Sequence, residues 1–398
     1  MKIKNLSKKI FINICISIIS IVLVLVLLEP ITIFSLPYLP LNLQAYLEPS
    51  VRILCQNSKK GLIPENYIAI IGDSYAQGYG DWLFNSNQWS NPKFHSAHLI
   101  NSLLNKDVVS FGTAGSGSIE SIVESFIPKI TSIKKEFNIK DPKIILFYFY
   151  EGNDLQDDLM YLEHHGYFKN TKEKNKLEKK EFYSFLEERI KSQTDHVKYK
   201  PISLKLLVGL IKNALAKLIY KKNIETISCH EPKKDPNKYN LVEINKKSVF
   251  LPDDIQAPPV EMYKDEIDLG IRTFKYSLEY LINKFPKSSI AVIYIPSVIS
   301  CYHLKSDVFV HRSPFLKNRK NVYSYNLIEK EGNDLVKKIN TVCNYYKVNF
   351  FNTSPDLKLT ASKKLIHGPC DIEHFNKDGY EAFSKSIVSF LKKEKLII

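Results

Sequence analysis

The sequence has little of what marks a metal-binding, nucleotide-binding or repeat protein. None of its six cysteines has the close spacing of a zinc site. No glycine-rich segment ends in the Lys-Ser/Thr of a phosphate-binding loop or has the dinucleotide-binding spacing. No repeat period and no long low-complexity tract occurs. With 44% hydrophobic and 12% aromatic residues the chain is expected to fold, and we expect it to need neither a metal nor an organic cofactor.

Net charge is also small over most of the chain. The net charge is +14 at pH 7, but four lysines within residues 1–9 and a lysine-rich segment at residues 169–222 carry nearly all of it. The remainder is close to neutral and has no zinc-finger spacing, RNA-binding signature or evident recognition helix. We therefore expect no nucleic-acid partner.

One long apolar run lies near the N-terminus. Residues 10–28 contain no charged side chain, and about 20 apolar residues are enough to cross a bilayer as a helix. Lysines precede the run and Glu29 follows it, which predicts a cytoplasmic N-terminus and a remainder in the periplasm or at the cell surface. A cleaved signal peptide is the alternative. We favour an uncleaved single-pass anchor, because Glu29-Pro30 offers no small-x-small cleavage site.

These features divide the first part of the chain. We assign residues 1–28 to a cytoplasmic flank and transmembrane anchor, and residues 29–66, rich in proline and leucine, to a membrane-proximal linker. Export would place five cysteines in an oxidising compartment, where one or two disulfides can form. These five are Cys55, Cys229, Cys301, Cys343 and Cys370.

Residues 67–395 show the alternation of short apolar strands and helices that is typical of an α/β domain. Five such strands joined by helices predict a three-layer, doubly wound sheet of about five parallel strands. The predicted strands are residues 67–72, 107–111, 143–150, 289–295 and 348–351, and the predicted helices are residues 94–105, 118–138, 262–285, 326–346 and 376–393.

A largely helical, lysine-rich insertion interrupts this pattern at residues 155–260. Six apolar residues within it recur at helical spacing and form one face: Leu204, Leu207, Val208, Ile211, Leu215 and Leu218. A helix that packs this face on the core is the favoured interpretation, and a basic amphipathic helix on the membrane surface is the alternative.

Reactive residues follow four of the predicted strands. Gly72-Asp73-Ser74 follows the first strand, a glycine-rich loop at residues 110–117 the second, and Gly152-Asn153-Asp154 the third; Asp371 and His374 lie three residues apart before the last helix. Each motif alone is compatible with a turn or a helix cap. Four of them at the carboxyl ends of parallel strands, where sites form in such sheets, indicate a catalytic site.

In these motifs the sequence resembles the SGNH (GDSL-like) hydrolase superfamily, over about residues 66–153 and 262–395. The resemblance implies a flavodoxin-like sheet, Ser74 as nucleophile, His374 as general base and Asp371 as its partner. It implies an oxyanion hole made of the Ser74 N–H, the Gly115 N–H and the Asn153 side chain, with no metal. Ser110 stands where the family often has asparagine, so Gly112 or Gly117 is an alternative to Gly115.

We therefore expect a serine esterase that acts on an ester-bearing small molecule, glycan or lipid through an acyl-serine intermediate. The motifs do not separate a hydrolase from an O-acyltransferase to an extracytoplasmic glycan, since the two differ only in the acceptor of the acyl group. A non-catalytic envelope module that binds glycan or membrane is the alternative from another class.

Overall fold

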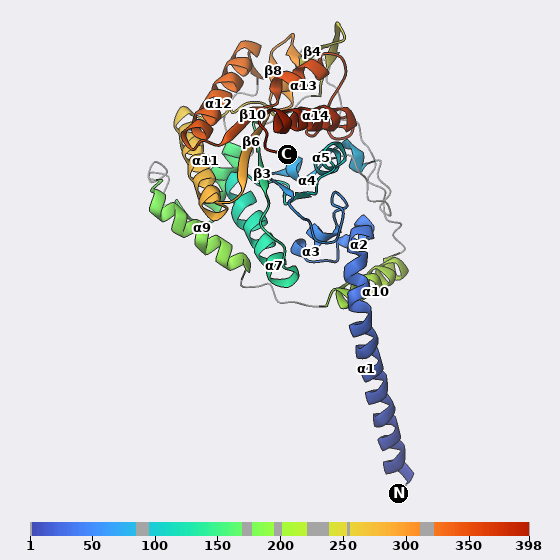
Figure 1. Ribbon diagram of the computed structural model, residues 1–398. Helices are drawn as coiled ribbons and strands as arrows, with labels where there is room; N and C mark the ends of the chain where they lie inside the picture. The colour runs from blue at the N-terminus through green and yellow to red at the C-terminus, as the bar shows by residue number, and fades with distance from the viewer. Residues whose placement is uncertain are drawn as a thin grey trace. The chain divides into compact units, whose positions relative to one another are not determined.

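The computed structural model describes residues 2–84, 95–168, 177–194, 201–220, 239–252, 255–310 and 322–397. The chain forms two compact units. The larger comprises residues 58–86, 92–196 and 226–398, and the smaller comprises residues 1–57, 87–91 and 197–225. The predicted α/β domain and the long N-terminal helix are both present, one in each unit (Figure 1).

A parallel sheet of five strands forms the centre of the larger unit. The strands are β1 (Ile68–Ile71), β2 (Val108–Ser110), β3 (Ile144–Tyr150), β6 (Ser289–Ile295) and β10 (Asn349–Asn352), in the order β10-β6-β3-β1-β2. All neighbouring pairs are parallel, and Ile68 of β1 pairs with Val108 of β2 and with Ile144 of β3. The sequence-based prediction of five parallel strands is confirmed.

The central strands are apolar on both faces because helices cover both faces of the sheet. All seven residues of β3 are buried. Tyr148 contacts Phe383 of α14 (Lys377–Lys393), whereas Phe147 and Phe149 contact Phe274 of α11 (Lys264–Lys284). Successive residues of a strand point to opposite faces, so this one strand joins the three layers.

Helices α5 (Ser96–Leu104) and α14 lie together on one face. The other face carries α11, α8 (Asp154–His164) and one long helical segment, seen on the left of Figure 1. That segment comprises α6 (Ser118–Glu120), the π-helical turn η4 (Ser121–Phe126) and α7 (Ile127–Phe137). The remaining helices of this unit are α4 (Ser74–Gln77), η3 (Asp81–Leu83), α9 (Lys179–Thr194), η6 (Ile299–Cys301), α12 (Tyr325–Tyr345) and α13 (Ser354–Ala361).

Two small antiparallel sheets were not predicted from the sequence. One contains β4 (Leu241–Ile244), β5 (Lys247–Phe250) and β7 (His303–Leu304), and the other pairs β8 (Val308–Phe309) with β9 (Val322–Tyr323). The β4–β5 hairpin turns at Asn245 and Lys246, both with positive φ. Strands of two to four residues are too short to show a period of two in the sequence.

The smaller unit begins with α1 (Lys2–Ser35), which continues seven residues beyond the uncharged run and has Pro30 inside it. Residues 10–38 are long and apolar enough to cross a membrane. Four short elements follow, so residues 29–57 of the expected linker are largely helical: η1 (Leu36–Tyr38), α2 (Leu41–Gln44), α3 (Pro49–Arg52) and η2 (Ile53–Cys55). Residues 58–66 of that linker belong to the larger unit.

The last element of the smaller unit is α10 (Ile202–Tyr220), which comes from the insertion. The favoured sequence interpretation, in which its apolar stripe packs on the core, is wrong. Leu204, Leu207, Val208, Ile211 and Leu215 are each 40–50% exposed, and the helix packs through its opposite face instead. The side chain of Leu218 lies outside the described residues.

One described cysteine is in a disulfide. Cys370 is disulfide-bonded, whereas Cys15, Cys55, Cys301 and Cys343 are not. Cys229 lies outside the described residues.

The central strand yields a stability prediction. Phe147→Ala removes a fully buried ring and should lower the free energy of unfolding by about 3–5 kcal/mol, because the cavity it leaves adds to the lost burial. Leu359→Ala on α13, where the side chain is 62% exposed, is the matched control and should change it by less than about 0.5 kcal/mol. Denaturant unfolding of the detergent-solubilised full chain, followed by circular dichroism, measures both. Equal effects would contradict the assignment of β3 to the core.

Candidate active site

The strand order creates a switch point between β1 and β3. The chain passes from β1 to β2 on one side, and then returns to place β3, β6 and β10 on the other. In open α/β sheets, ligands bind beside such a switch point, at the carboxyl ends of the strands. Ser74 begins α4 directly after β1, and Asn153 precedes α8 directly after β3.

The turn after β1 requires its glycine. Gly72 has φ +140°, and a Cβ atom on it would lie 2.9 Å from the carbonyl oxygen of Tyr148. The buried carboxylate of Asp73 accepts a hydrogen bond from the Tyr75 N–H and so caps α4. Ser74 is then the first residue of the helix, partly exposed.

A chain of hydrogen bonds joins two of the four motifs. The Nε2 atom of His374 lies 2.7 Å from the Ser74 hydroxyl oxygen. The Nδ1 atom lies 2.8 and 2.9 Å from the two carboxylate oxygens of Asp371. Because an ionised carboxylate only accepts, Nδ1 carries the proton of the neutral ring, which leaves Nε2 free to accept from the serine.

Side chains from the turn after β1 hold the loop that carries the histidine. Asp81 accepts from the backbone N–H groups of Cys370 (2.6 Å) and Asp371 (3.1 Å). The Tyr75 hydroxyl donates to the Glu373 carbonyl at 2.6 Å. Sequence reasoning missed Asp81, because nothing in its local pattern indicates a partner 290 positions away.

The last helix closes the same loop from its other end. Asn376 caps α14 by accepting from the Gly379 N–H, and its amide donates to the carbonyl of Leu365. The Tyr380 hydroxyl of α14 donates to the carbonyl of Tyr79 in the turn after β1. The loop is thus bonded at both ends to elements that β1 positions.

The surroundings of His374 favour its charged form. Burial lowers the pKa of the imidazole, but the hydrogen bond and charge of Asp371, with the charge of Asp73, raise the pKa above 6.5. Burial raises the pKa of Asp73 to about 6, against the opposing effect of His374. A negative environment around His374 would stabilise an imidazolium ion.

Three N–H groups of the glycine-rich loop are hydrogen-bonded. Those of Gly112, Thr113 and Ala114 donate to Ser110 Oγ, to the Gly72 carbonyl and to Gln77 Oε1. Gly115 is exposed with φ +75°, and no described atom lies within 4 Å of where its Cβ would be.

The two alternatives to Gly115 lie in more crowded surroundings. The N–H of Gly112 bonds to Ser110, and a Cβ on Gly117 would lie 2.7 Å from a carboxylate oxygen of Asp158, because that glycine packs against α8. Ser110 itself donates to the Ala76 carbonyl at 2.5 Å. Its hydroxyl therefore ties the glycine-rich loop to α4, at the position where the family often has asparagine.

Asn153 precedes α8 without capping the helix through its side chain. Its Oδ1 atom is buried and has no partner in the described part of the chain, so the amide is not committed to a turn. Glu151, two positions earlier, anchors this loop: its buried carboxylate accepts from the Tyr294 hydroxyl and from both the N–H and the hydroxyl of Ser297, each at 2.7 Å. Sequence reasoning assigned Glu151 no role.

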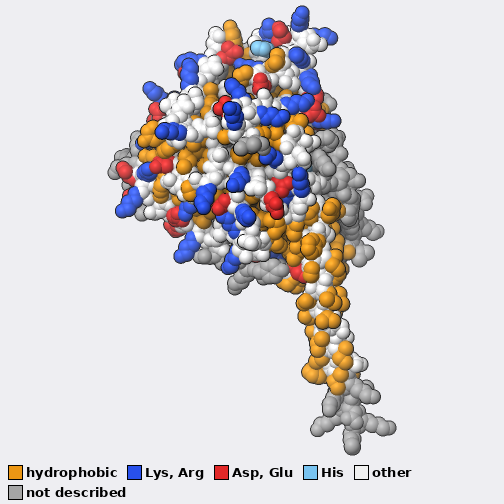
Figure 2. Space-filling view, in the orientation of Figure 1, with side chains coloured by type: hydrophobic (Ala, Val, Ile, Leu, Met, Phe, Trp, Pro, Cys, Tyr) orange, Lys and Arg blue, Asp and Glu red, His pale blue; other side chains and the backbone are white. Residues whose placement is uncertain are grey.

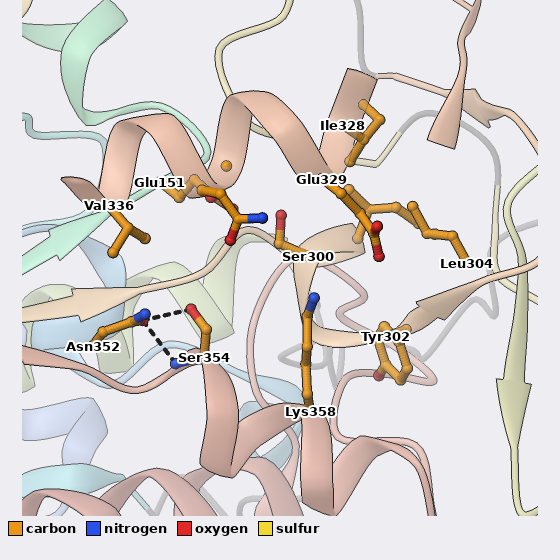
Figure 3. Close-up of a pocket in the computed structure, with 13 residues that line it drawn as sticks. Glu151, Ser300, Tyr302, Leu304, Ile328, Glu329, Val336, Asn352, Ser354 and Lys358 are labelled. Carbon is orange, nitrogen blue, oxygen red and sulfur yellow. Dashed lines mark hydrogen bonds between the residues drawn. The ribbon is translucent and has the colours of Figure 1, made fainter. Parts of the chain in front are cut away.

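A separate cavity of about 40 Å³ lies at the carboxyl ends of β3, β6 and β10 (Figure 3). Glu151 lines it, and the Lys358 side chain rises toward the space between Ser300 and Glu329. This volume suits about one to three water molecules rather than an organic substrate. None of Ser74, Asp371 and His374 lines it.

Within the described ranges no group of three or more histidines, cysteines or acids could hold a metal ion. Behind the glycine-rich loop, burial raises the pKa of Asp154 and Asp158 well above the usual range of a carboxyl group. Burial lowers the pKa of His367 to about 3, and its Nδ1 lies 3.0 Å from the Tyr302 hydroxyl.

No protein-family model matches the chain, and no curated protein sequence matches it. Among solved structures it is similar to an aryl esterase of M. smegmatis, at 10% identity over 82% of this chain and 98% of that one, with a TM-score of 0.32. It is similar to a carbohydrate acetylesterase from Sinorhizobium meliloti, at 8% identity, 83% and 100% coverage and a TM-score of 0.34. A family two carbohydrate esterase from Cellvibrio japonicus is similar at 11% identity, 83% and 62% coverage and a TM-score of 0.33.

The site geometry makes a testable prediction about protonation. The pKa of His374 should lie above 6.5 in the parent, and Asp371→Asn should lower it, because the variant loses the charge that raises the pKa while burial still lowers it. Nitrogen chemical shifts of the histidine rings, recorded against pH, measure this. His367 is the internal control, with ring signals that stay constant above about pH 5. An unchanged His374 pKa in the variant would contradict the pairing.

Proposed function

We propose that this protein is a serine esterase of the SGNH type, acting on carboxylic esters through an acyl-serine intermediate. The observation that carries the proposal is the hydrogen-bonded series Ser74–His374–Asp371. His374 lies 2.7 Å from Ser74, 300 positions away, and 2.8 Å from Asp371. A serine, an imidazole and a carboxylate in this order are the groups that activate a hydroxyl for nucleophilic attack.

In the first step Ser74 Oγ attacks the ester carbonyl carbon while His374 Nε2 takes the hydroxyl proton. Asp371 keeps the ring in the tautomer that accepts at Nε2 and stabilises the imidazolium that forms. The tetrahedral intermediate then collapses, and the leaving alkoxide takes the proton from Nε2. The products are an acyl-serine and an alcohol.

The developing oxyanion needs donors that are not bonded to other groups. The N–H of Ser74, at the first position of α4, has no partner within the helix. The N–H of Gly115, an exposed residue of the glycine-rich loop, and the side-chain amide of Asn153, whose Oδ1 has no partner in the described residues, are the other two donors we assign to this role. The buried bonds of Ser110 and Glu151 act as supports that hold these two loops in place.

In the second step His374 activates an acceptor that attacks the acyl-serine and restores the free hydroxyl. Water as acceptor makes the protein a hydrolase, and a sugar hydroxyl makes it an O-acyltransferase. We propose the hydrolase. Incubation with an ester donor and a glycan acceptor, followed by mass analysis of the glycan, distinguishes the two, because only transfer increases the mass of the glycan.

We further propose that the larger unit lies outside the cytoplasm and that α1 remains as an uncleaved anchor, with its N-terminus in the cytoplasm. The apolar run and its flanking lysines support this orientation. The disulfide at Cys370 supports it too, since disulfides persist in oxidising compartments. An exported location favours an ester of an envelope glycan or lipid as substrate.

The nucleophile has a direct test. Ser74→Ala should lower hydrolysis of a short-chain p-nitrophenyl ester by about 10³-fold or more and abolish labelling by a fluorophosphonate, because no other group supplies the attacking oxygen. Ser354→Ala is the matched control. Ser354 also begins a helix after a strand of the same sheet, but its hydroxyl donates to Asn352, so this variant should keep full activity and labelling.

Absence of turnover and labelling in the folded parent would refute the esterase. A glycan bound equally by the parent and by Ser74→Ala, without turnover, would indicate a non-catalytic envelope module instead.

The oxyanion donor has a separate test. Asn153→Asp keeps the size of the side chain but replaces the amide donor with a carboxylate, so kcat should fall by about 10²–10³-fold while KM changes little. Fluorophosphonate labelling should slow as well, since that reaction also places negative charge on an oxygen near Ser74. A kcat within about twofold of the parent would remove Asn153 from the oxyanion hole.

A further inference from the structure

Helix α10 carries an apolar stripe that no described part of the chain covers. Five of its large hydrophobic residues recur three or four positions apart and thus share one face. They are Leu204, Leu207, Val208, Ile211 and Leu215, with exposures of 40%, 41%, 42%, 50% and 50%. An exposed apolar stripe of this length is an interaction surface in most proteins.

The opposite face of α10 is already packed within the smaller unit. Ile202 and Leu206 are buried, and Gly209 lies so close to the Tyr46 ring that a Cβ atom on it would come within 2.3 Å of the ring. The stripe is therefore not the face by which α10 joins its own unit, and it stays available for another contact.

Side chains of α1 position the start of α10. The Glu29 carboxylate accepts from the N–H groups of Ile202 (2.7 Å) and Ser203 (2.9 Å) and from the Ser203 hydroxyl (2.6 Å). Lys205 adds an ion pair with Glu48 at 2.5 Å. These contacts satisfy the first donors of α10 and fix its N-terminus beside the end of the uncharged run of α1.

That position corresponds to a definite depth in a bilayer. Residues 10–28 rise by about 28 Å as a helix, which matches a hydrocarbon core of about 30 Å. Glu29 then lies at the boundary between lipid and water, and α10 begins at the same level. Within the smaller unit α10 lies across the end of α1 rather than along it (Figure 1), which is the direction of a helix in the membrane plane.

The surface chemistry agrees with this depth. Hydrophobic side chains cover α1 along its described length and continue over the region where α2 and α10 meet its upper end (Figure 2). Lys205 and Lys212 lie on α10 beside the stripe, and Lys212 is exposed. Apolar residues on one face with lysines at its border are typical of a helix at the lipid headgroup boundary.

We propose that α10 lies in the interface of the membrane that α1 crosses, with the stripe of Leu204 to Leu215 inserted among the lipid chains. This inference rests on the proposed anchoring by α1. The lysine-rich segment to which α10 belongs, residues 169–222 with 15 basic and 6 acidic residues, favours an anionic membrane surface as the partner. A second copy of the chain carries the same basic segment and would repel it.

Photocrosslinking in the full-length protein tests the proposal. A diazirine amino acid replaces Ile211, and the protein is reconstituted in vesicles of phosphatidylethanolamine and phosphatidylglycerol. Irradiation should give phospholipid adducts on the peptide that contains residue 211. Replacement of Lys337 on α12, where the side chain is 76% exposed, is the control for solvent-facing positions, and we expect adducts at residue 211 to exceed it by about tenfold.

A third position separates this proposal from the anchoring on which it rests. Ile19 of α1 is 65% exposed, and a diazirine there reports the transmembrane span alone. Lipid adducts at residue 19 with none above the control at residue 211 would overturn the placement of α10 and leave the anchor intact. Loss of adducts at both positions would refute the anchor itself. Crosslinks from residue 211 to a second chain would show that the stripe is a protein interface, which also overturns the proposal.

Discussion

The hydrogen bond between His374 and Ser74 joins two residues 300 positions apart, and its geometry depends on how the last loop returns to the first strand. Three side chains hold the last loop beside the first strand. Asp81 and Tyr75 form hydrogen bonds to the loop, and Tyr380 of α14 forms one to Tyr79. Each donates to or accepts from the backbone, so the loop is held without committing the side chains of Asp371 and His374. Those two side chains remain available to each other and to the serine.

The sheet supplies the rigid reference for these loops. Because β3 is buried along its whole length and pairs with β1 and β6 in continuous register, the ends of these strands are fixed relative to one another. Short polar supports then set the loops. Glu151 ties the loop after β3 to that after β6, and Ser110 ties the glycine-rich loop to α4. Buried polar groups that are fully bonded in this way specify one arrangement.

The amphipathic pattern of α10 does not by itself say what its apolar face contacts. Its leucines and lysines follow the spacing of a helix with an apolar face, and that spacing is the same whether the face meets a protein core or lipid. The contacts of Glu29, Tyr46 and Glu48 show which side of the helix packs within its own unit, and they leave the apolar stripe exposed. Those contacts join residues more than 150 positions apart, beyond the reach of any local pattern.

By itself the sequence determined the five parallel strands, the covering helices and the long apolar segment at the N-terminus, because burial on both faces of a sheet and passage through lipid each impose their own apolar pattern. It also marked Ser74, Asn153, Asp371 and His374 as residues that follow strands. Only the tertiary structure decided which of them touch, that the Gly112 N–H is bonded to Ser110, and that Asp81 and Glu151 support the loops. The reason is physical: a hydrogen bond is set by ångström-scale geometry between distant segments, whereas the periodicity of a sequence reports only which face of each element is buried.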